Sequence, residues 1–240
     1  MKRPAAWAAV VIALVLGGTG CATERPVAVM PVGAVASTVP APVRIQLPAH
    51  PRAFFFGDSW TAGKSASPGN GYARVVGRAL GWTVTVAPSG SGTGYVHTYA
   101  PERVVYPLRA AKLGPITADI IVLQGGLNDR PGPLTHFADA VRRTVKTLRQ
   151  KSGNTPIVML GPAPFTGKPT TALTTIDQQE ASVAKQLGIR YISPLKQRWI
   201  NPTNVATVID PKTQHPSTTG HAYVGGRVAQ ALQSITVLRK

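Results

Sequence analysis

The sequence predicts one α/β domain in which a mostly parallel sheet is covered by helices on both faces. Short apolar runs alternate along the chain with longer segments in which apolar residues recur every three or four positions. One run, Asp119 to Leu123, is continuously apolar after its first residue, as in a central strand of a parallel sheet. The length of 240 residues is sufficient for one domain of this class with a sizeable core.

Five strands and five helices are expected from these runs. The expected strands are Ala53–Phe56, Thr83–Ala87, Asp119–Leu123, Pro156–Leu160 and Arg190–Ile192. The expected helices are Tyr72–Leu80, Glu102–Lys112, Leu134–Lys151, Ala172–Leu187 and Ala222–Leu232. Each helix follows a strand and has an apolar face. Gly81 and Gly114 lie just beyond two of the helical patterns and predict where these helices end.

The N-terminus has the pattern of an export signal. Lys2 and Arg3 precede an uncharged apolar run from Ala5 to Leu16, and small residues follow. The run is too short to be a good membrane span. We therefore expect residues 1–21 to be a signal peptide and the protein to be exported.

The single cysteine, Cys21, lies where such a signal is cut. The order from Leu16 to Cys21 resembles a bacterial lipobox, in which the cysteine is lipidated, although Gly18 stands where an aliphatic residue is usual. We expect a lipid anchor at Cys21, as in an actinobacterial lipoprotein of the cell envelope. Ordinary cleavage after Ala22, which would release a secreted protein, is the alternative.

Residues 22–52 are expected to form an extended tether. Prolines at positions 26, 31, 40, 42, 48 and 51 leave no helical or alternating period in this segment. The domain itself is then expected to span residues 53–240.

Composition excludes several classes of function. With its single cysteine at the signal junction, the expected domain has neither a disulfide nor a thiol-based site. The formal charge of +17 favours anionic surroundings, but the basic residues are scattered, so we expect no nucleic-acid partner. His50, His97 and His136 lack neighbours at metal-ligand spacing and are expected on the surface or in loops, so no metal site is expected.

Four loops are expected to meet at the carboxyl ends of the strands, where open α/β sheets bind ligands. They are Gly57–Trp60, Ser89–Tyr95, Gln124–Asp129 and the segment before the last helix. Each loop is polar or rich in glycine. The sequence therefore predicts a site built from all four.

The motifs in these loops resemble those of the SGNH or GDSL hydrolase family over about residues 53–236. The resemblance rests on four blocks in the family's order: Gly57-Asp58-Ser59, the glycine loop from Ser89 to Gly94, Gly126-Leu127-Asn128-Asp129, and His215-Pro216. It implies a flavodoxin-like three-layer α/β/α sandwich with a five-stranded sheet. It also implies an esterase or acylhydrolase without cofactor or metal.

The resemblance implies a role for each matching residue. Ser59 is the expected nucleophile and His215 the base that accepts its proton. The Ser59 N–H, the Gly92 N–H and the Asn128 amide are the expected oxyanion donors, with Gly90 as the alternative glycine. Asp58, Asp129 and His221 are instead expected to brace loops or pack in the core.

The third member of the triad departs from the family. The family's acid usually precedes the histidine by three residues, and that position is Lys212. The nearest carboxylate is Asp210, five residues upstream of His215. We expect Asp210 to orient the imidazole, and the alternative is a dyad in which a backbone carbonyl does so.

The expected function is hydrolysis of short acyl or acetyl esters, including those of envelope glycans or lipids. An O-acyltransferase for envelope polysaccharide and a non-catalytic glycan-binding module are the alternatives. Arg130–Pro133 and Phe165–Thr171 are candidate loops of the acyl pocket, and Tyr95 and His97 are candidate lining residues. Trp60 is expected either in the pocket wall or in the core.

Overall fold

The computed structural model describes residues 44–88, 90–99 and 101–239. The predicted signal peptide, Cys21 and residues 22–43 of the predicted tether lie outside these residues, as does Ser89 of the glycine loop. None of the helices in the described part of the chain is long and apolar enough to cross a membrane.

The central sheet has five parallel strands in the order β3-β2-β4-β5-β6. Their bounds are β2 Arg52–Phe56, β3 Thr83–Val86, β4 Ile120–Gln124, β5 Ile157–Leu160 and β6 Arg190–Ile192. This is the flavodoxin-like order, in which the chain adds strands first on one side of β2 and then on the other. The predicted fold class is confirmed, and β4 is buried along its whole length.

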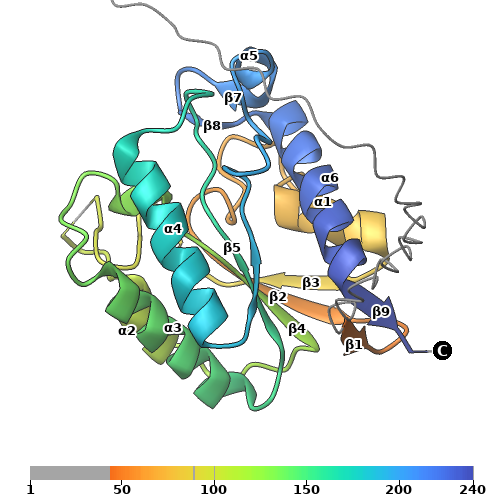
Figure 1. Ribbon diagram of the computed structural model, residues 1–240. Coiled ribbons are helices and arrows are strands. Elements are labelled where there is room, and N and C mark those ends of the chain that lie inside the picture. Colours follow the sequence, from red (N-terminus) through yellow and green to blue (C-terminus); the bar gives the residue numbers. More distant parts are fainter. Residues whose placement is uncertain (1–43, 89, 100, 240) are drawn as a thin grey trace, which may run out of the picture. The chain divides into compact units, whose positions relative to one another are not determined.

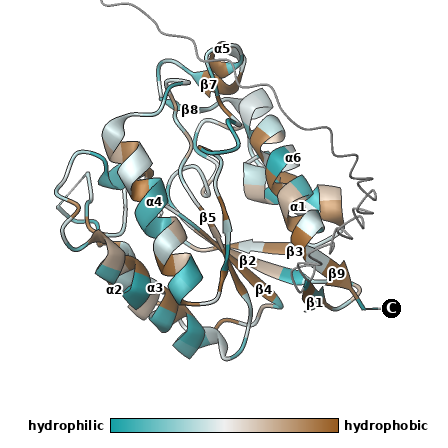
Figure 2. Cartoon of the chain, viewed as in Figure 1, coloured by the Kyte–Doolittle hydropathy of each residue, from teal (hydrophilic) through white to brown (hydrophobic). Residues whose placement is uncertain are grey.

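Helices cover both faces of the sheet (Figure 1). Their bounds are α1 Tyr72–Leu80, α2 Tyr106–Ala111, α3 Phe137–Ser152, α4 Thr171–Gln186 and α6 Thr218–Ile235. Phe55 packs on the side of α1 and α6, whereas Phe56 packs on the side of α2 and α3. Successive side chains of a strand point to opposite faces, so the aromatic run serves both layers of the core. Figure 2 shows hydrophobic colour on the central strands.

Two helix starts lie four residues from those predicted, the largest differences among the five. The helix expected from Glu102 begins at Tyr106, with Pro107 in its first turn, where proline is tolerated. The last helix begins at Thr218 rather than Ala222, because the Ser217 side chain accepts the Gly220 N–H and caps it. Gly220 resembles a helix breaker in the sequence, but a Cβ there would lie 1.8 Å from the Val208 carbonyl oxygen. Close packing therefore requires glycine in this first turn.

The predicted boundary between tether and domain, after residue 52, lies too late in the chain. Ile45–Leu47 forms β1, which pairs in parallel with β9, Thr236–Leu238, and Leu47 is fully buried. The partner strand lies almost at the other end of the chain. A local pattern does not reveal such a pairing, and residues 45–47 belong to the folded domain.

A short hairpin precedes α6. It consists of β7, Ile209–Asp210, and β8, His215–Pro216, and it follows the one-turn helix α5, Val205–Val208. In Figure 1 the hairpin lies beyond the end of α6 and close to α5. The hairpin carries His215 toward the carboxyl end of β2.

Candidate active site

Ser59 and His215 meet at the carboxyl end of β2. The strand ends at Phe56, and the following turn places Ser59 Oγ 2.7 Å from His215 Nε2. The two residues are 156 positions apart in the sequence. Ser59 is only 5% exposed, so its hydroxyl is directed at the histidine from a largely buried position.

Buried hydrogen bonds hold the turn that carries Ser59. Asp58 accepts the Trp60 N–H at 2.9 Å and the Gln124 side-chain amide at 3.2 Å. Its own N–H donates to Gln124 Oε1 at 3.3 Å. Burial raises the pKa of Asp58 to about 6, against the opposing effect of these hydrogen bonds. Asp58 thus braces the turn, as expected.

The imidazole of His215 is oriented by a backbone carbonyl. His215 Nδ1 lies 2.5 Å from the Thr213 carbonyl oxygen. A carbonyl only accepts, so Nδ1 carries the proton and Nε2 presents its lone pair to Ser59. Burial lowers the pKa of His215 below its ordinary 6.5 and Lys64 lowers it further, while the Thr213 carbonyl and Asp210 act in the opposite direction.

The structure does not bring the Asp210 carboxylate to the imidazole. Asp210 Oδ1 accepts the Lys212 N–H at 2.9 Å, two residues along the chain. Aspartate commonly makes this local turn contact, which here engages one of its carboxylate oxygens. The expected contact between Asp210 and His215 is therefore not formed. The structure has the alternative arrangement, in which a backbone carbonyl orients the imidazole.

The expected oxyanion donors lie around one cleft of about 250 Å³. Ser59, Gly92 and Asn128 all line it. Among the described residues, the N–H groups of Ser59 and Gly92 have no hydrogen-bond acceptor. The Asn128 amide donates to the Thr93 carbonyl at 2.8 Å, which leaves its second N–H. Gly90 instead packs against the turn, where a Cβ would lie 2.4 Å from the Gly57 carbonyl oxygen.

Asp129 joins the Asn128 loop to the segment after the glycine loop. Its carboxylate accepts the N–H groups of Tyr95, Val96 and His97 at 2.8 to 3.0 Å. Burial raises the pKa of Asp129 to about 6. A Cβ on Gly94 would come within 2.6 Å of both carboxylate oxygens, so this close approach requires glycine.

Arg109 lies beneath the site, and sequence reasoning missed it. Its Nη1 donates to Thr93 Oγ1 at 2.8 Å and its Nη2 to the Gly57 carbonyl at 2.7 Å. The guanidinium carbon lies 3.8 Å from the centroid of the Phe56 ring and 4.8 Å from that of Tyr106. Arg109 therefore ties the serine turn to the glycine loop. In the sequence it is one basic residue of a helix, without a signal that sets it apart.

His221 and the predicted pocket tyrosine lie in the core. His221 accepts the Tyr72 N–H at Nδ1 and donates from Nε2 to the Lys64 carbonyl at 3.0 Å, so it packs as expected. Tyr95 is fully buried against Tyr106 and Phe137, and neither it nor His97 lines the cleft. The structure places neither candidate lining residue in the cleft, because the backbone N–H groups of Tyr95, Val96 and His97 are bound to Asp129. His97 lies in a loop, as expected.

Both predicted pocket loops contribute one residue to the cleft, Arg130 and Phe165. Trp60 lines the cleft and also belongs to the core, so both expectations for it hold. Sequence reasoning did not identify the other lining residues, Lys64, Tyr99, Leu127, Thr213 and Gln214.

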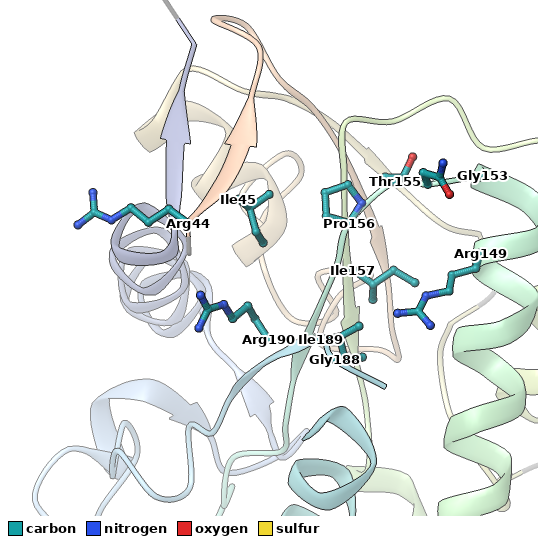
Figure 3. Close-up of a pocket in the computed structure, with 11 residues that line it drawn as sticks. Arg44, Ile45, Arg149, Gly153, Thr155, Pro156, Ile157, Gly188, Ile189 and Arg190 are labelled. Carbon is teal, nitrogen blue, oxygen red and sulfur yellow. The ribbon is translucent and has the colours of Figure 1, made fainter. Parts of the chain in front are cut away.

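A larger cleft of about 860 Å³ lies at the amino ends of β5 and β6 (Figure 3). It is lined by Arg44, Arg149 and Arg190 among others, and it contains no serine and no histidine. The side chains expected to be catalytic, Ser59 and His215, line the smaller cleft at the carboxyl ends of the strands. The smaller cleft is therefore the candidate active site.

The chain is similar in sequence to one known family. Residues 55–223 match the profile of the GDSL-like lipase/acylhydrolase family. The matched range contains Ser59, Asn128 and His215. A search against curated proteins finds no significant match.

Solved structures share the fold. A family two carbohydrate esterase from Clostridium thermocellum, solved as an active-site mutant, is 19% identical with a TM-score of 0.61, over 78% of this chain and 64% of that chain. The family two carbohydrate esterase from Cellvibrio japonicus is also 19% identical with a TM-score of 0.61, over 82% and 63%. The salicylyl-acyltransferase SsfX3 from a tetracycline biosynthetic pathway is 19% identical with a TM-score of 0.58, over 79% and 56%. At this identity the likeness concerns the fold.

Proposed function

Because the chain belongs to the GDSL-like lipase/acylhydrolase family, we propose that it is a serine esterase that transfers the acyl group of a carboxylic ester to Ser59 and then to water. The proposal rests chiefly on the 2.7 Å hydrogen bond between Ser59 Oγ and His215 Nε2. A serine hydroxyl is a weak nucleophile unless a base takes its proton, and this contact provides the base.

In the first half of the reaction, His215 Nε2 removes the proton from Ser59 Oγ as the oxygen attacks the ester carbonyl carbon. The carbonyl oxygen becomes an oxyanion, which the N–H groups of Ser59 and Gly92 and the Asn128 amide stabilise. Collapse of this intermediate breaks the bond to the alcohol, and the imidazolium returns the proton to the leaving oxygen. The acyl group is now an ester of Ser59.

In the second half, water replaces the alcohol. His215 takes a proton from the attacking water, the same donors stabilise the second oxyanion, and the acid leaves as Ser59 recovers its proton. The Thr213 carbonyl holds the imidazole in the required tautomer throughout and stabilises the imidazolium, although it brings no full negative charge.

An O-acyltransferase would use the same groups with a sugar or other hydroxyl in place of water. The likeness of the fold to both carbohydrate esterases and an acyltransferase keeps this alternative open. Product analysis distinguishes the two, because a transferase forms a new ester when a glycan acceptor is added and an esterase releases only the acid.

The N-terminal sequence supports an exported enzyme in this proposal. Residues 1–21 have the order of a signal peptide, and lipidation at Cys21 would hold the domain at the membrane. Short acyl or acetyl esters of envelope glycans or lipids are then the accessible substrates. Mass spectrometry of the mature N-terminus tests this point, because a lipidated cysteine and a free N-terminus after Ala22 differ in mass.

A fluorophosphonate probe should label Ser59 in the wild-type protein. The probe forms a bond only with an activated serine, so labelling should be lost in Ser59→Ala and strongly reduced in His215→Ala. Mass spectrometry of the labelled peptide identifies the position. Equal labelling of wild type and Ser59→Ala would eliminate the proposed nucleophile, and a wild type that does not react would favour the non-catalytic binding module.

The value of kcat/KM should fall as the pH is lowered, and the midpoint of this fall should lie below the ordinary histidine pKa of 6.5. His215 works as a base only when neutral, and burial together with Lys64 lowers its pKa, so the neutral form persists to lower pH. Lys64→Gln removes a positive charge that lowers this pKa, so the midpoint should move to higher pH. Profiles of kcat/KM against pH for a neutral ester measure both midpoints. An unmoved midpoint in Lys64→Gln would contradict the assignment.

A further inference from the structure

The cleft that contains Ser59 and His215 is lined by two cationic side chains and by no acidic one among the described residues. The cationic residues are Lys64 and Arg130. Neither forms an ion pair within the described part of the chain. The cleft therefore carries positive charge without an internal counter-ion.

Arg130 is held in place by its own neighbours. Its Nε donates to the Leu127 carbonyl at 2.7 Å, and its guanidinium carbon lies 4.4 Å from the centroid of the Phe165 ring. The terminal Nη groups have no acceptor among the described residues. An arginine fixed in this way presents its remaining donors to an anion with little further loss of side-chain entropy.

Two carboxylates close in sequence to residues that line the cleft accept backbone N–H groups. Asp129, which adjoins Arg130, accepts three backbone N–H groups. Asp210, near His215, accepts the Lys212 N–H. Neither forms an ion pair with Arg130 in the described part of the chain, so the Nη donors of Arg130 are available to an anionic group from outside the chain.

When the substrate is neutral, the cation beside the catalytic base makes protonation of that base less favourable. The charge of Lys64 disfavours protonation of His215, yet the imidazolium must form during the reaction. A negative charge on the bound substrate would offset this repulsion. The electrostatics of the site thus favour an anionic ester over a neutral one of the same size.

We propose that the substrate is an ester with a carboxylate or phosphate group on its acyl or alcohol part, and that Arg130 is the residue that binds this group. The inference rests on the esterase activity proposed above and specifies its substrate class. The matching chemistry is that of a half-ester of a dicarboxylic acid or an ester of an acidic or phosphorylated alcohol. Arg130 here determines specificity and takes no part in proton transfer.

Two substrate pairs test the proposal and locate the charge. Mono-p-nitrophenyl succinate and p-nitrophenyl butyrate differ by a carboxylate on the acyl side, and 4-acetoxybenzoate and its methyl ester differ by one on the alcohol side. The wild type should prefer the anionic member of at least one pair by about tenfold or more in kcat/KM, the value of one charged hydrogen bond. This preference should weaken as salt is added.

Arg130→Gln should lower kcat/KM for the anionic ester more than that for the neutral ester, mainly through a higher KM for the anionic ester, and so abolish the preference. Arg130→Lys keeps the charge and should restore part of the preference, which a purely structural role would not do. The matched control is Arg143→Gln, which removes one charge from an exposed position on α3 and should change neither substrate. Equal kcat/KM within both pairs for the wild type would overturn the proposal.

Calorimetry with Ser59→Ala separates this proposal from the proposed activity. This variant should bind mono-p-nitrophenyl succinate or 4-acetoxybenzoate more tightly than the neutral counterpart. Selective binding in a protein whose wild type hydrolyses no ester would support the anionic ligand class and refute the esterase. Hydrolysis by the wild type without any charge preference, in kinetics or in binding, would leave the esterase standing and refute the role of Arg130.

Discussion

Replacing His215 with alanine is expected to lower kcat/KM for an aryl ester by about 10³-fold or more, whereas Asp210→Asn is expected to lower it by less than about tenfold. His215 Nε2 is the only base within hydrogen-bond distance of Ser59 Oγ among the described residues. The Asp210 carboxylate contacts the Lys212 N–H, and the Thr213 carbonyl occupies the position at Nδ1 that a triad acid would take. Steady-state kinetics of both variants measure the difference.

The control for His215→Ala is His136→Ala, because His136 is exposed and precedes α3, away from the cleft. Its activity should equal that of the wild type. If Asp210→Asn instead lost about 10³-fold or more, as when a triad aspartate is replaced, Asp210 would have to move to the imidazole during the reaction. The dyad would then be refuted.

Replacing Arg109 with methionine is expected to lower kcat by about 10²-fold with little change in KM. The guanidinium holds the Gly57 carbonyl and Thr93 Oγ1 together, and Thr93 in turn accepts the Asn128 amide. The three loops that carry the oxyanion donors are thus joined by one buried cation. A small displacement of these donors weakens binding of the transition state more than that of the ground state.

Arg109→Met should also lower the melting temperature, because the buried Gly57 carbonyl loses its donor at a cost of about 1 to 3 kcal/mol. The Thr93 hydroxyl loses one partner as well but keeps its bond to the Gly90 carbonyl. Arg109→Lys keeps the charge but lacks the planar guanidinium that donates to Thr93 Oγ1 and the Gly57 carbonyl together. Its kcat should therefore lie between those of the methionine variant and the wild type. Kinetics at a temperature where all variants are folded separate the two effects. A lower melting temperature with unchanged kcat would limit Arg109 to a structural role.

The sheet was largely predictable because its signals are local. An apolar run such as Ile120 to Leu123 has few alternatives to a central strand, and Gly81 has a positive φ of 67° at the end of α1, as a helix stop requires. The pairing of β1 with β9 was not predictable in this way. Its two strands of three residues each come from opposite ends of the domain.

The site likewise has residues that the sequence predicted and partners of those residues that it did not. Ser59, Asn128 and His215 stand in short motifs at strand ends, and the parallel sheet brings those ends together whatever the details of packing. The partners of these residues are set by contacts between loops that lie far apart in the sequence. Thr213 rather than Asp210 forms the hydrogen bond to the imidazole, and the Asp210 carboxylate accepts the Lys212 N–H in a local turn.

The sequence by itself determined the fold class, the strand that presents Ser59 and the histidine that contacts it. Hydrophobic periodicity and short motifs are sufficient for these, since each acts over a few residues. Only the tertiary structure decided which group orients His215, that Arg109 joins the loops of the proposed oxyanion donors, and that Lys64 and Arg130 line the cleft. Each of these depends on which side chains long-range packing brings within about 4 Å, a distance beyond which hydrogen bonds and contacts are lost.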